Sequence, residues 1–378
     1  MKNELVYWVW LGCSIGFGSY KVKAINRFYS SIRKFYDAGR PEWESCGFLS
    51  SNEVRKLESF SVDDANLILK QCREKGIKVV SLRDPAYPRA LKNIVNPPCV
   101  LYIKGEVDFN VEDIKIAVVG TRKATPYGLN VAYNLGFKLA RCDAVVVSGG
   151  ALGIDSAAHK GAINALGKTV CVLGCGISYR YLIKNEPLRT KISQIGALIS
   201  EYPPNYPCAA CTFPLRNRII SGLSRAVVVV EAGEKSGSLI TANIALEQNR
   251  DVFSVPGNIE SWASKGTNSL IRSGARPVVC ARDIIEEYDL KPKKQPICRI
   301  AFKSQQQIVN GSNELSSDGS AVLDVLSHEN SNGAMDLEDI CELTDMPVQR
   351  VLSAMTQLEI RNLVKIFPGK KYSKLVGV

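Results

Sequence analysis

The sequence predicts an α/β protein whose centre is a doubly wound, mostly parallel β-sheet, preceded by a helical domain and followed by a small winged helix. Two observations predict the sheet: short continuous apolar segments alternate with helical segments along the middle of the chain, and glycine-rich loops follow the apolar segments. The third observation is the length of 378 residues, which exceeds what one hydrophobic core usually serves. We therefore predict a helical domain at 1–75, a sheet domain at 76–290, a linker at 291–318 and a winged helix at 319–378.

The helical domain is predicted to consist of short helices separated by glycines and polar turns. One turn, Ile15-Gly16-Phe17-Gly18, alternates apolar residues with glycines. Such a turn joins the helices of helix–hairpin–helix modules, where backbone N–H groups approach a phosphate. A tight turn that only connects two helices is equally compatible with the pattern.

The apolar segments of the sheet domain are continuous and do not alternate with polar residues. Strands buried on both faces of a parallel sheet have this pattern, and the helical segments between them fit right-handed βαβ connections. The predicted strands are 116–119, 144–147, 169–173, 197–200, 226–230, 251–255 and 277–280. The predicted helices include 129–140, 154–166 and 239–248.

The linker is rich in lysine, proline, glutamine and serine. The sequence after it contains three helical patterns and two short strands, which together describe a winged helix, at 321–328, 337–343, 347–360, 363–367 and 372–376. Arg350 is the only basic residue of the third helix, whereas a helix that reads a DNA groove normally carries more positive charge. We therefore predict that this domain contacts another protein.

Lysine and arginine number 48 against 37 aspartates and glutamates, which gives the chain a net charge of +11. The excess lies before residue 319, because 319–378 contain six basic and eight acidic residues. This distribution indicates a polyanion such as a nucleic acid on the body of the protein. No apolar run approaches the roughly 18 residues that span a bilayer, and no signal-peptide cleavage site is evident, so we expect a cytosolic protein.

Twelve cysteines in a long chain without an export signal do not predict disulfides. The one set with ligand-like spacing is Cys171, Cys175, Cys208 and Cys211. Its first pair would begin inside a buried strand and its spacing is irregular, whereas structural zinc requires four well-placed ligands. We predict neither a metal site nor a cofactor.

The sequence offers few groups for catalysis. His159 and His328 are the only histidines, and the candidate acids or bases near the predicted loops are Asp155, Glu201 and Glu231. The alternative is structural: the aspartate caps a helix and the glutamates orient arginines. No activated nucleophile stands beside a base, so we predict that the protein is not an enzyme.

Glycine- or proline-containing loops follow six of the predicted strands, and the carboxyl ends of parallel strands meet at one edge of a sheet. Several of these loops precede helices, so free N–H groups and helix dipoles would point into one crevice. The loops are 120–122, 148–151, 174–176, 201–204, 231–233 and 256–258. A row of phosphate-binding loops indicates a nucleic-acid strand, and neither a dinucleotide fingerprint nor a P-loop is present to indicate a nucleotide.

The segment 213–224 has the residues that a DNA strand needs. Phe213 can stack on a base, Arg216 and Arg218 can grip phosphates, and Asn217 can hydrogen-bond. The alternative places the phenylalanine in the core and has one arginine merely capping a helix or pairing with Glu201 or Glu231.

Several stretches, taken in order, resemble the DNA processing protein A (DprA, also called Smf) family across residues 80–285. These stretches include Asp84-Pro85-x-Tyr87-Pro88, Gly120-Thr121-Arg122, Ser148-Gly149-Gly150-Ala151-x-Gly153-Ile154-Asp155, 213–224, Glu231-Ala232-Gly233, Val255-Pro256-Gly257 and Gly266-Thr267-Asn268. The resemblance implies a sterile-alpha-motif-like N-terminal domain, an extended Rossmann core and a C-terminal winged helix. It also implies a homodimer that binds single-stranded DNA and loads RecA recombinase on it during natural transformation.

By this resemblance the DNA strand is expected at a set of loop and helix residues of the core. They are Arg122, Ser148, Gly149, Gly150, Gly174, Gly176, Phe213, Arg216, Asn217 and Arg218. The chain departs from the family at Ala210, where a basic residue is usual, and at Leu182, where proline is usual after Tyr181. The missing charge is expected to weaken DNA binding unless Lys184 or Arg180 replaces it.

Two other functions remain as alternatives. Nucleoside 5′-monophosphate phosphoribohydrolases resembling the LOG proteins also place glycine loops over a phosphate, in the motif Pro-Gly-Gly-x-Gly-Thr-x-x-Glu. The corresponding region here, 231–238, lacks the terminal catalytic glutamate of that motif. The third possibility is an adaptor that acts mainly through its acidic tail domain.

Overall fold

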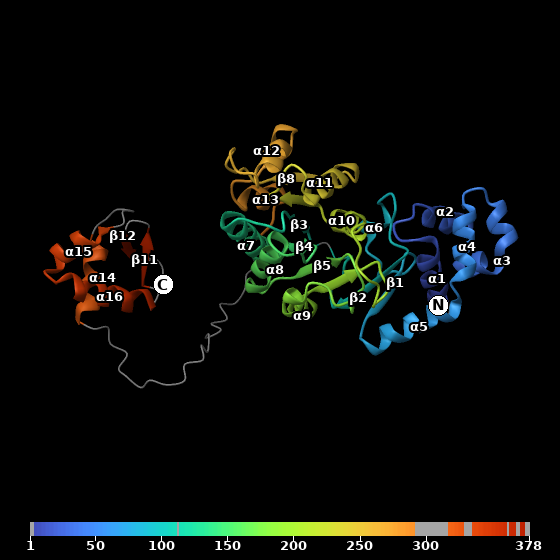
Figure 1. Ribbon diagram of the computed structural model, residues 1–378, viewed down its shortest axis with the longest axis horizontal. Helices are drawn as coiled ribbons and strands as arrows, with labels where there is room; N and C mark the ends of the chain where they lie inside the picture. The colour runs from blue at the N-terminus through green and yellow to red at the C-terminus, as the bar shows by residue number, and fades with distance from the viewer. Residues whose placement is uncertain are drawn as a thin grey trace. The chain divides into compact units, whose positions relative to one another are not determined.

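The computed structural model describes residues 4–111, 113–291, 317–328, 335–360, 363–367 and 371–374 (Figure 1). The chain divides into two compact units, 1–296 and 297–378, and each is described by itself. The predicted linker, 291–318, lies outside the described residues except at its two ends. The finer division of the first unit at residue 75 stays a proposal.

A nine-stranded sheet forms the centre of the first unit, in the order β1-β2-β6-β5-β4-β3-β7-β8-β9. Strands β3 to β9 are parallel to one another, which confirms the predicted doubly wound sheet. The strands are β1 (Lys78–Ser81), β2 (Val100–Gly105), β3 (Lys115–Val119), β4 (Val145–Ser148), β5 (Thr169–Leu173), β6 (Ala197–Ser200), β7 (Ala226–Val229), β8 (Asp251–Ser254) and β9 (Arg276–Pro277).

Strands β1 and β2 were not among the strands predicted from apolar segments. They form a hairpin-like pair, and β2 runs antiparallel to β6, so they extend the parallel sheet at one side. The family resemblance implied an extended Rossmann core, and these two strands form such an extension.

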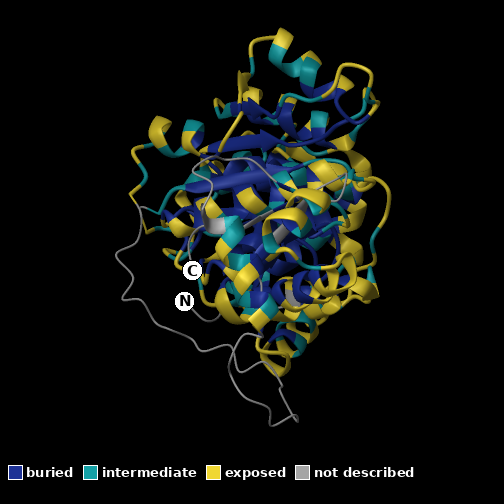
Figure 2. Cartoon of the chain, turned by 90° about the vertical axis from the view of Figure 1, so that its left-hand side faces the viewer, coloured by how far each residue is buried: buried dark blue, intermediate teal, exposed yellow. Residues whose placement is uncertain are grey.

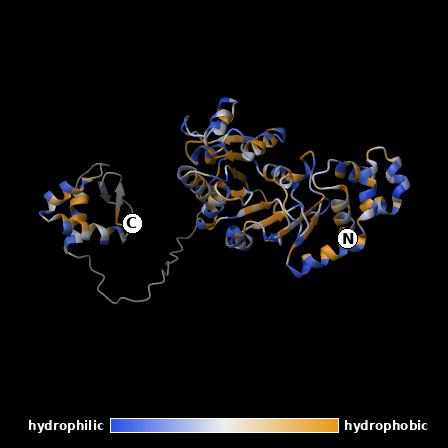
Figure 3. Cartoon of the chain, viewed as in Figure 1, coloured by the Kyte–Doolittle hydropathy of each residue, from blue (hydrophilic) through white to orange (hydrophobic). Residues whose placement is uncertain are grey.

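Both faces of the sheet are covered by helices, as the continuous apolar strands predict. Ile116 and Val118 of β3 pack with α7 and α8, whereas Ala117 and Val119 face the cluster that contains α10 and α11. Figures 2 and 3 show the strands of this unit as buried and apolar. The helices are α6 (Arg89–Lys92), α7 (Pro126–Arg141), α8 (Ile154–Asn164), α9 (Glu186–Ile195), α10 (Thr212–Leu223), α11 (Gly237–Glu247), α12 (Lys265–Arg272) and α13 (Arg282–Glu287).

Five helices precede the sheet, as predicted, and share its hydrophobic core. They are α1 (Leu5–Ile15), α2 (Lys21–Phe28), α3 (Ile32–Ser45), α4 (Ser51–Ser59) and α5 (Val62–Glu74). The glycine-containing turn between α1 and α2 has positive φ at Gly16 and Gly18. The N–H of Gly18 donates to Glu201 Oε1 at 3.1 Å, so this turn packs on the sheet domain and the structural alternative is supported.

The described residues of the second unit form three helices and a three-stranded sheet in the order β10-β12-β11, which is the predicted winged helix. Its elements are α14 (Ser317–His328), β10 (Met335–Asp336), α15 (Leu337–Thr344), α16 (Val348–Ile360), β11 (Val364–Phe367) and β12 (Lys371–Lys374). Arg350, the one basic residue of α16, donates from Nε to Asp318 Oδ2 at 2.9 Å. Within the described part of the chain, no helix has the length and apolar character that crossing a membrane requires.

Candidate nucleic-acid interface

The loops at the carboxyl edge of the sheet follow one another in the order of the strands. Because β7, β3, β4, β5 and β6 are neighbours and parallel, the loops after them leave the sheet side by side. Glu231, Arg122, Gly149, Gly174 and Tyr202 mark these five loops in spatial order. The crevice predicted from the sequence therefore runs along this edge.

The loop after β4 is held in a fixed conformation by hydrogen bonds. The carboxylate of Asp155, in the first turn of α8, accepts from the N–H groups of Gly149 at 3.2 Å and Ala151 at 3.3 Å. The carbonyl of Gly149 accepts from Arg216 Nη1 at 2.8 Å. Asn185 donates to the carbonyl of Gly150, which has a φ of 66° that favours glycine. The loop is therefore preorganised. The aspartate binds this loop and not the free N–H groups of the helix, and within the described residues α8 has no side-chain cap, so the helix-capping role considered for the aspartate is not observed.

The glycines of the predicted site allow close packing. A Cβ at position 149 would lie 2.4 Å from Arg216 Nη2, and one at 174 would lie 2.9 Å from Phe213 Cδ1. A Cβ at Gly176 would lie 2.1 Å from the carbonyl oxygen of Pro203. All three glycines, with Ser148 and Gly150, are buried. These buried residues therefore lie beneath the accessible side chains of the crevice and set the shape of its base.

The accessible part of the crevice is cationic and aromatic. Arg122 is exposed, and its guanidinium lies 5.0 Å from the centre of the half-buried Phe213 ring. The ring of Tyr181 also lies near it, with 5.4 Å between the ring centres. Asn217, one turn further along α10, is half-buried, and Lys184 is exposed on the short helix 183–185. A flat ring beside a cation can accept a base and its phosphate.

Arg216 and Arg218 lie inside the protein, only 5% and 3% exposed. Arg216 donates to the carbonyls of Gly149 and Val172, and burial lowers the pKa of its guanidinium while Asp155 opposes that shift. Arg218 forms a buried ion pair with Glu201, as the alternative interpretation of this segment expected. Direct contact of either arginine with DNA stays a prediction, and their internal partners favour a supporting role.

The candidate acids and bases also have internal partners. Glu231 is 2% exposed, and its carboxylate accepts from the backbone N–H of Thr125 at 2.9 Å and from the hydroxyl of the same residue, at the start of α7. Among the described residues no arginine hydrogen-bonds to this carboxylate, contrary to one of the alternatives considered from the sequence. Burial lowers the pKa of His159 to about 3 and raises that of Asp155. A neutral, fully enclosed imidazole is poorly suited to proton transfer at neutral pH.

The cysteines of the candidate ligand set do not assemble. Across the described ranges, no group of three or more histidine, cysteine or acidic side chains could hold a metal ion. Cys171 and Cys175 are buried, and burial raises the pKa of their thiols to about 12 and about 11.

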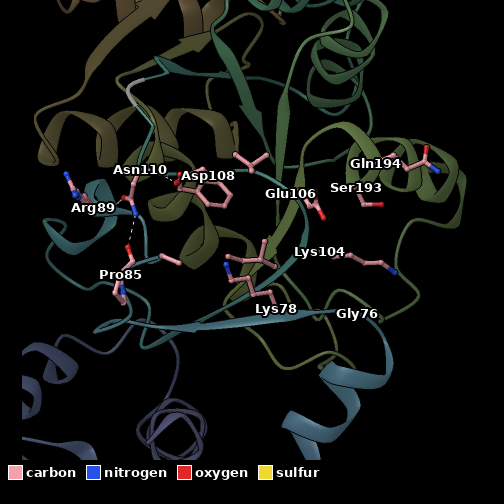
Figure 4. A pocket seen from close by; sticks show the side chains of 15 residues that line it. Gly76, Lys78, Pro85, Arg89, Lys104, Glu106, Asp108, Asn110, Ser193 and Gln194 are labelled. Atoms are coloured by element: carbon pink, nitrogen blue, oxygen red, sulfur yellow. Dashed lines mark hydrogen bonds between the residues drawn. The ribbon is translucent and has the colours of Figure 1, made fainter. Parts of the chain in front are cut away.

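A cavity at another edge of the sheet is not part of the crevice. It measures about 1170 Å³ and is lined by residues of β1, β2 and the end of α9, among them Lys78, Lys104 and Gln194 (Figure 4). Gly105, also in its lining, pairs with Ala197 at the beginning of β6, so the cavity lies at the amino edge of the parallel sheet. It is separate from the loop row.

Two residues that support the crevice were not singled out for such a role from the sequence. Tyr181 contacts Phe213, and Asn185 holds both the Gly150 carbonyl and the hydroxyl of Ser156. For Tyr181, the sequence offered a signal, because it is an aromatic residue shortly after the third glycine turn. For Asn185, nothing in the local pattern distinguishes it from any polar surface residue.

Comparison with known proteins gives consistent matches. The family described as DNA recombination-mediator protein A matches residues 78–289, and the DprA winged helix domain matches 310–370. DNA processing protein DprA of Bacillus subtilis is 43% identical over 220 residues, which are 58% of this chain and 74% of that protein.

Two solved structures are similar as well. DNA processing protein A from Streptococcus pneumoniae superposes with a TM-score of 0.64 at 31% identity, over 74% of this chain and 95% of that one. The protein of the same name from Helicobacter pylori, described for its single-stranded DNA binding mode, gives a TM-score of 0.52 at 30% identity over 56% of this chain and 95% of that one.

Proposed function

This chain belongs to the DNA recombination-mediator protein A family, and from that premise we propose that it binds single-stranded DNA along the carboxyl edge of its sheet. It protects the strand and delivers it to RecA recombinase during natural transformation. The relative from Helicobacter pylori, described as binding single-stranded DNA, supports the choice of ligand. The net charge of +11 supports a polyanionic partner.

The pairing of Arg122 with Phe213 carries this proposal. Arg122 comes from the loop after β3 and Phe213 from the first turn of α10. The guanidinium of the exposed arginine lies 5.0 Å from the centre of the half-buried ring, at the edge where the loops meet. A base stacked on the ring contributes roughly 1–3 kcal/mol whatever its sequence, and the neighbouring guanidinium neutralises a phosphate. A binder of any incoming strand needs this tolerance.

The remaining site residues divide into two groups in the proposal. Asn217 and Lys184 are accessible and contact the strand directly. The buried residues shape and hold the surface: Ser148, Gly149, Gly150, Gly174, Gly176, Arg216 and Arg218. Lys184 supplies the positive charge that Ala210 lacks.

The test compares binding of labelled oligothymidylate and of a duplex across salt concentrations. Arg122→Ala is expected to weaken single-strand binding and to reduce the slope of log affinity against log salt by about 0.7, because one phosphate contact is lost. Arg216→Met is expected to weaken binding with an unchanged slope, because that guanidinium binds carbonyl oxygens inside the protein.

The matched control is Arg141→Ala, an exposed arginine at the end of α7 and therefore away from the carboxyl edge. It should retain the wild-type affinity. If Arg122→Ala and Arg141→Ala have equal effects, the proposed crevice is wrong. If Arg216→Met reduces the slope as Arg122→Ala does, the buried arginine contacts a phosphate.

We further propose that the protein acts without catalysis, which separates it from the phosphoribohydrolase alternative. The inward orientation of Glu231 and the enclosed imidazole of His159 support this. Incubation with AMP should release no adenine. Release that Glu231→Gln abolishes would favour the enzyme.

The family resemblance also carries the proposals of a homodimer and of a cytosolic site of action with RecA. The winged helix contacts another protein in this scheme, because its helix α16 contains one basic residue, which is ion-paired to Asp318. The division into 1–75, 76–290, 291–318 and 319–378 is part of the same proposal.

A further inference from the structure

A second hollow adjoins the loop row, between the helical domain and the sheet domain of the first unit. Its volume is about 800 Å³, within the range of ligand sites. Phe17 and Phe60 line it from the helical domain, and Tyr202 and Tyr206 line it from the loop after β6. We call this hollow the interdomain cleft.

The interdomain cleft has an aromatic wall with one accessible ring. The rings of Phe17, Tyr202 and Tyr206 contact one another at 4.6–5.0 Å between centres. Tyr206 is the outermost of the three and is 37% exposed. Its ring stacks on that of Tyr202 with an interplanar angle of 19°, so the aromatic stack can be extended by a further flat group.

The polar residues of the cleft match the chemistry of a nucleotide. Lys56 is exposed in the lining and provides a positive charge for a phosphate. The side-chain amides of Asn205 and Gln71 also line the cleft: Asn205 donates to Gln71 Oε1 at 3.2 Å and accepts from Lys75 at 3.0 Å. The Nε2 group of Gln71 can hydrogen-bond the edge of a base. Tyr202 is 1% exposed, and its hydroxyl has no hydrogen-bond partner in the part of the chain that the structure describes.

The cleft continues the row of loops. The row passes from Arg122 after β3 to the loop after β6, and Tyr202 of that last loop already belongs to the cleft. The first turn of α10 joins the two places, because Thr212 lines the cleft and the next residue, Phe213, carries the proposed stacking ring. A strand that lies on the phenylalanine can therefore enter the cleft within a short distance along its backbone.

We infer that the interdomain cleft is a second base-binding subsite of the DNA site, in which a nucleobase of the same single strand stacks on Tyr206 and Lys56 neutralises its phosphate. The inference rests on the proposed function, because it assigns one more contact to the same strand. It gives the helical domain a direct part in DNA binding. A protein ligand in the cleft is the competing occupant, which the absence of any effect on DNA binding would indicate.

The experiment measures the affinity of the full-length protein for oligothymidylates of increasing length. Tyr206→Ala should bind the shortest competent oligonucleotides like the wild type and bind longer ones about fivefold or more weakly, since one stacked base is lost. Tyr206→Phe should bind every length within about twofold of the wild type, because it keeps the ring. Lys56→Ala should reduce the salt slope only for the longer oligonucleotides.

Tyr20→Ala is the matched control, because Tyr20 is a 67% exposed tyrosine of the helical domain outside the cleft lining. A long oligonucleotide with 5-iodouracil at successive positions supplies an independent readout, and its photo-crosslink should map to Tyr206. Thermal melting of each variant checks that the fold is retained.

Each outcome has a separate meaning. Length-dependent weakening in Tyr206→Ala with a crosslink at that residue supports the subsite. Unchanged binding at every length and no crosslink, while Arg122→Ala binds poorly, overturns the subsite and leaves the proposed function standing. Failure of the wild-type protein to bind single strands at all overturns the proposed function itself.

Discussion

His159 shows how far burial changes a single side chain. Its imidazole is fully enclosed, Nδ1 lies 2.7 Å from the hydroxyl of Thr169, and Nε2 has no partner in the described part of the chain. Burial lowers its pKa from 6.5 to about 3. The folded protein therefore holds the imidazole neutral at a pH where the unfolded chain binds a proton.

This linkage predicts part of the acid sensitivity of the protein. The stability that the neutral imidazole provides is complete above pH 6.5 and is lost as the pH falls toward about 3. Between pH 6.5 and 4 the wild type should lose about 3 kcal/mol through this residue. His159→Gln, which cannot titrate, should lack this contribution, measured by urea unfolding at several pH values.

The comparison isolates the histidine because the other titrating groups are common to both proteins. The raised pKa of Asp155 acts in the opposite direction, since protonation of that buried carboxyl favours the folded state as the pH falls. Equal loss of stability on acidification in the two proteins would show that the imidazole is not the group responsible.

Arg216 shows what the sequence cannot reveal about a single residue. Its position in a polar segment predicted an accessible cation. No local pattern reveals that its guanidinium donates to carbonyl oxygens inside the protein.

At the level of elements, helix α10 connects three parts of the first unit. Arg218 on this helix pairs with Glu201 after β6, and the same carboxylate accepts from Gly18 in the turn between α1 and α2. Leu215, also on α10, packs so close to that turn that a Cβ at Gly18 would lie 2.3 Å from its Cδ1. The helix that carries Phe213 is thus held from the helical domain.

The buried ion pair between Arg218 and Glu201 should lower stability most when only one of its two residues is replaced. Glu201→Gln is expected to destabilise the fold by about 3–5 kcal/mol, because it leaves the Arg218 charge buried without a counter-ion. Replacing both residues, as in Glu201→Leu with Arg218→Met, should cost less than the sum of the single changes. A double-mutant cycle by chemical denaturation measures the difference, and strict additivity would argue against a direct interaction.

The elements of the sheet could be predicted where the pattern is unambiguous. Six of the seven parallel strands, β3 to β8, are short, mostly apolar segments that overlap their predicted ranges, because burial on both faces favours apolar residues along the strand. The seventh, β9, consists of two exposed residues, Arg276–Pro277, and shares only Pro277 with its predicted range. Strand β1, Lys78–Ser81, begins with an exposed lysine and only its last two residues are buried, so it lacks this pattern. Its pairing with β2 depends on contacts between segments, which one short segment does not reveal.

The proposed DNA-binding edge of the sheet could also be predicted in part from the sequence. The positions of the glycine loops follow from the strand order of a parallel sheet, so the edge could be located from sequence. The interdomain cleft could not, because it requires the helical domain to dock beside β6. The turn containing Gly18 was visible as a motif, but its partner Glu201 lies 183 positions away.

At the level of the whole molecule, charge is divided between the two units. The tail region 319–378 contains six basic and eight acidic residues, and the basic excess lies before it. The tail unit has its own hydrophobic cluster, which includes Val322, Ile340 and Leu358, so it can pack without the first unit. Single-strand binding and contact with another protein can therefore be separated by deletion.

Removal of residues 319–378 should leave the affinity for oligothymidylate and its salt slope within about twofold of the wild type, because counterion release comes from the basic first unit. The isolated tail should bind no oligonucleotide at the same salt concentration. Fluorescence anisotropy across salt checks both expectations, with the intact chain measured in parallel. A large fall in affinity on deletion would mean that the winged helix contacts DNA despite its acidic balance, and α16 would then be the element to examine through Arg350→Ala.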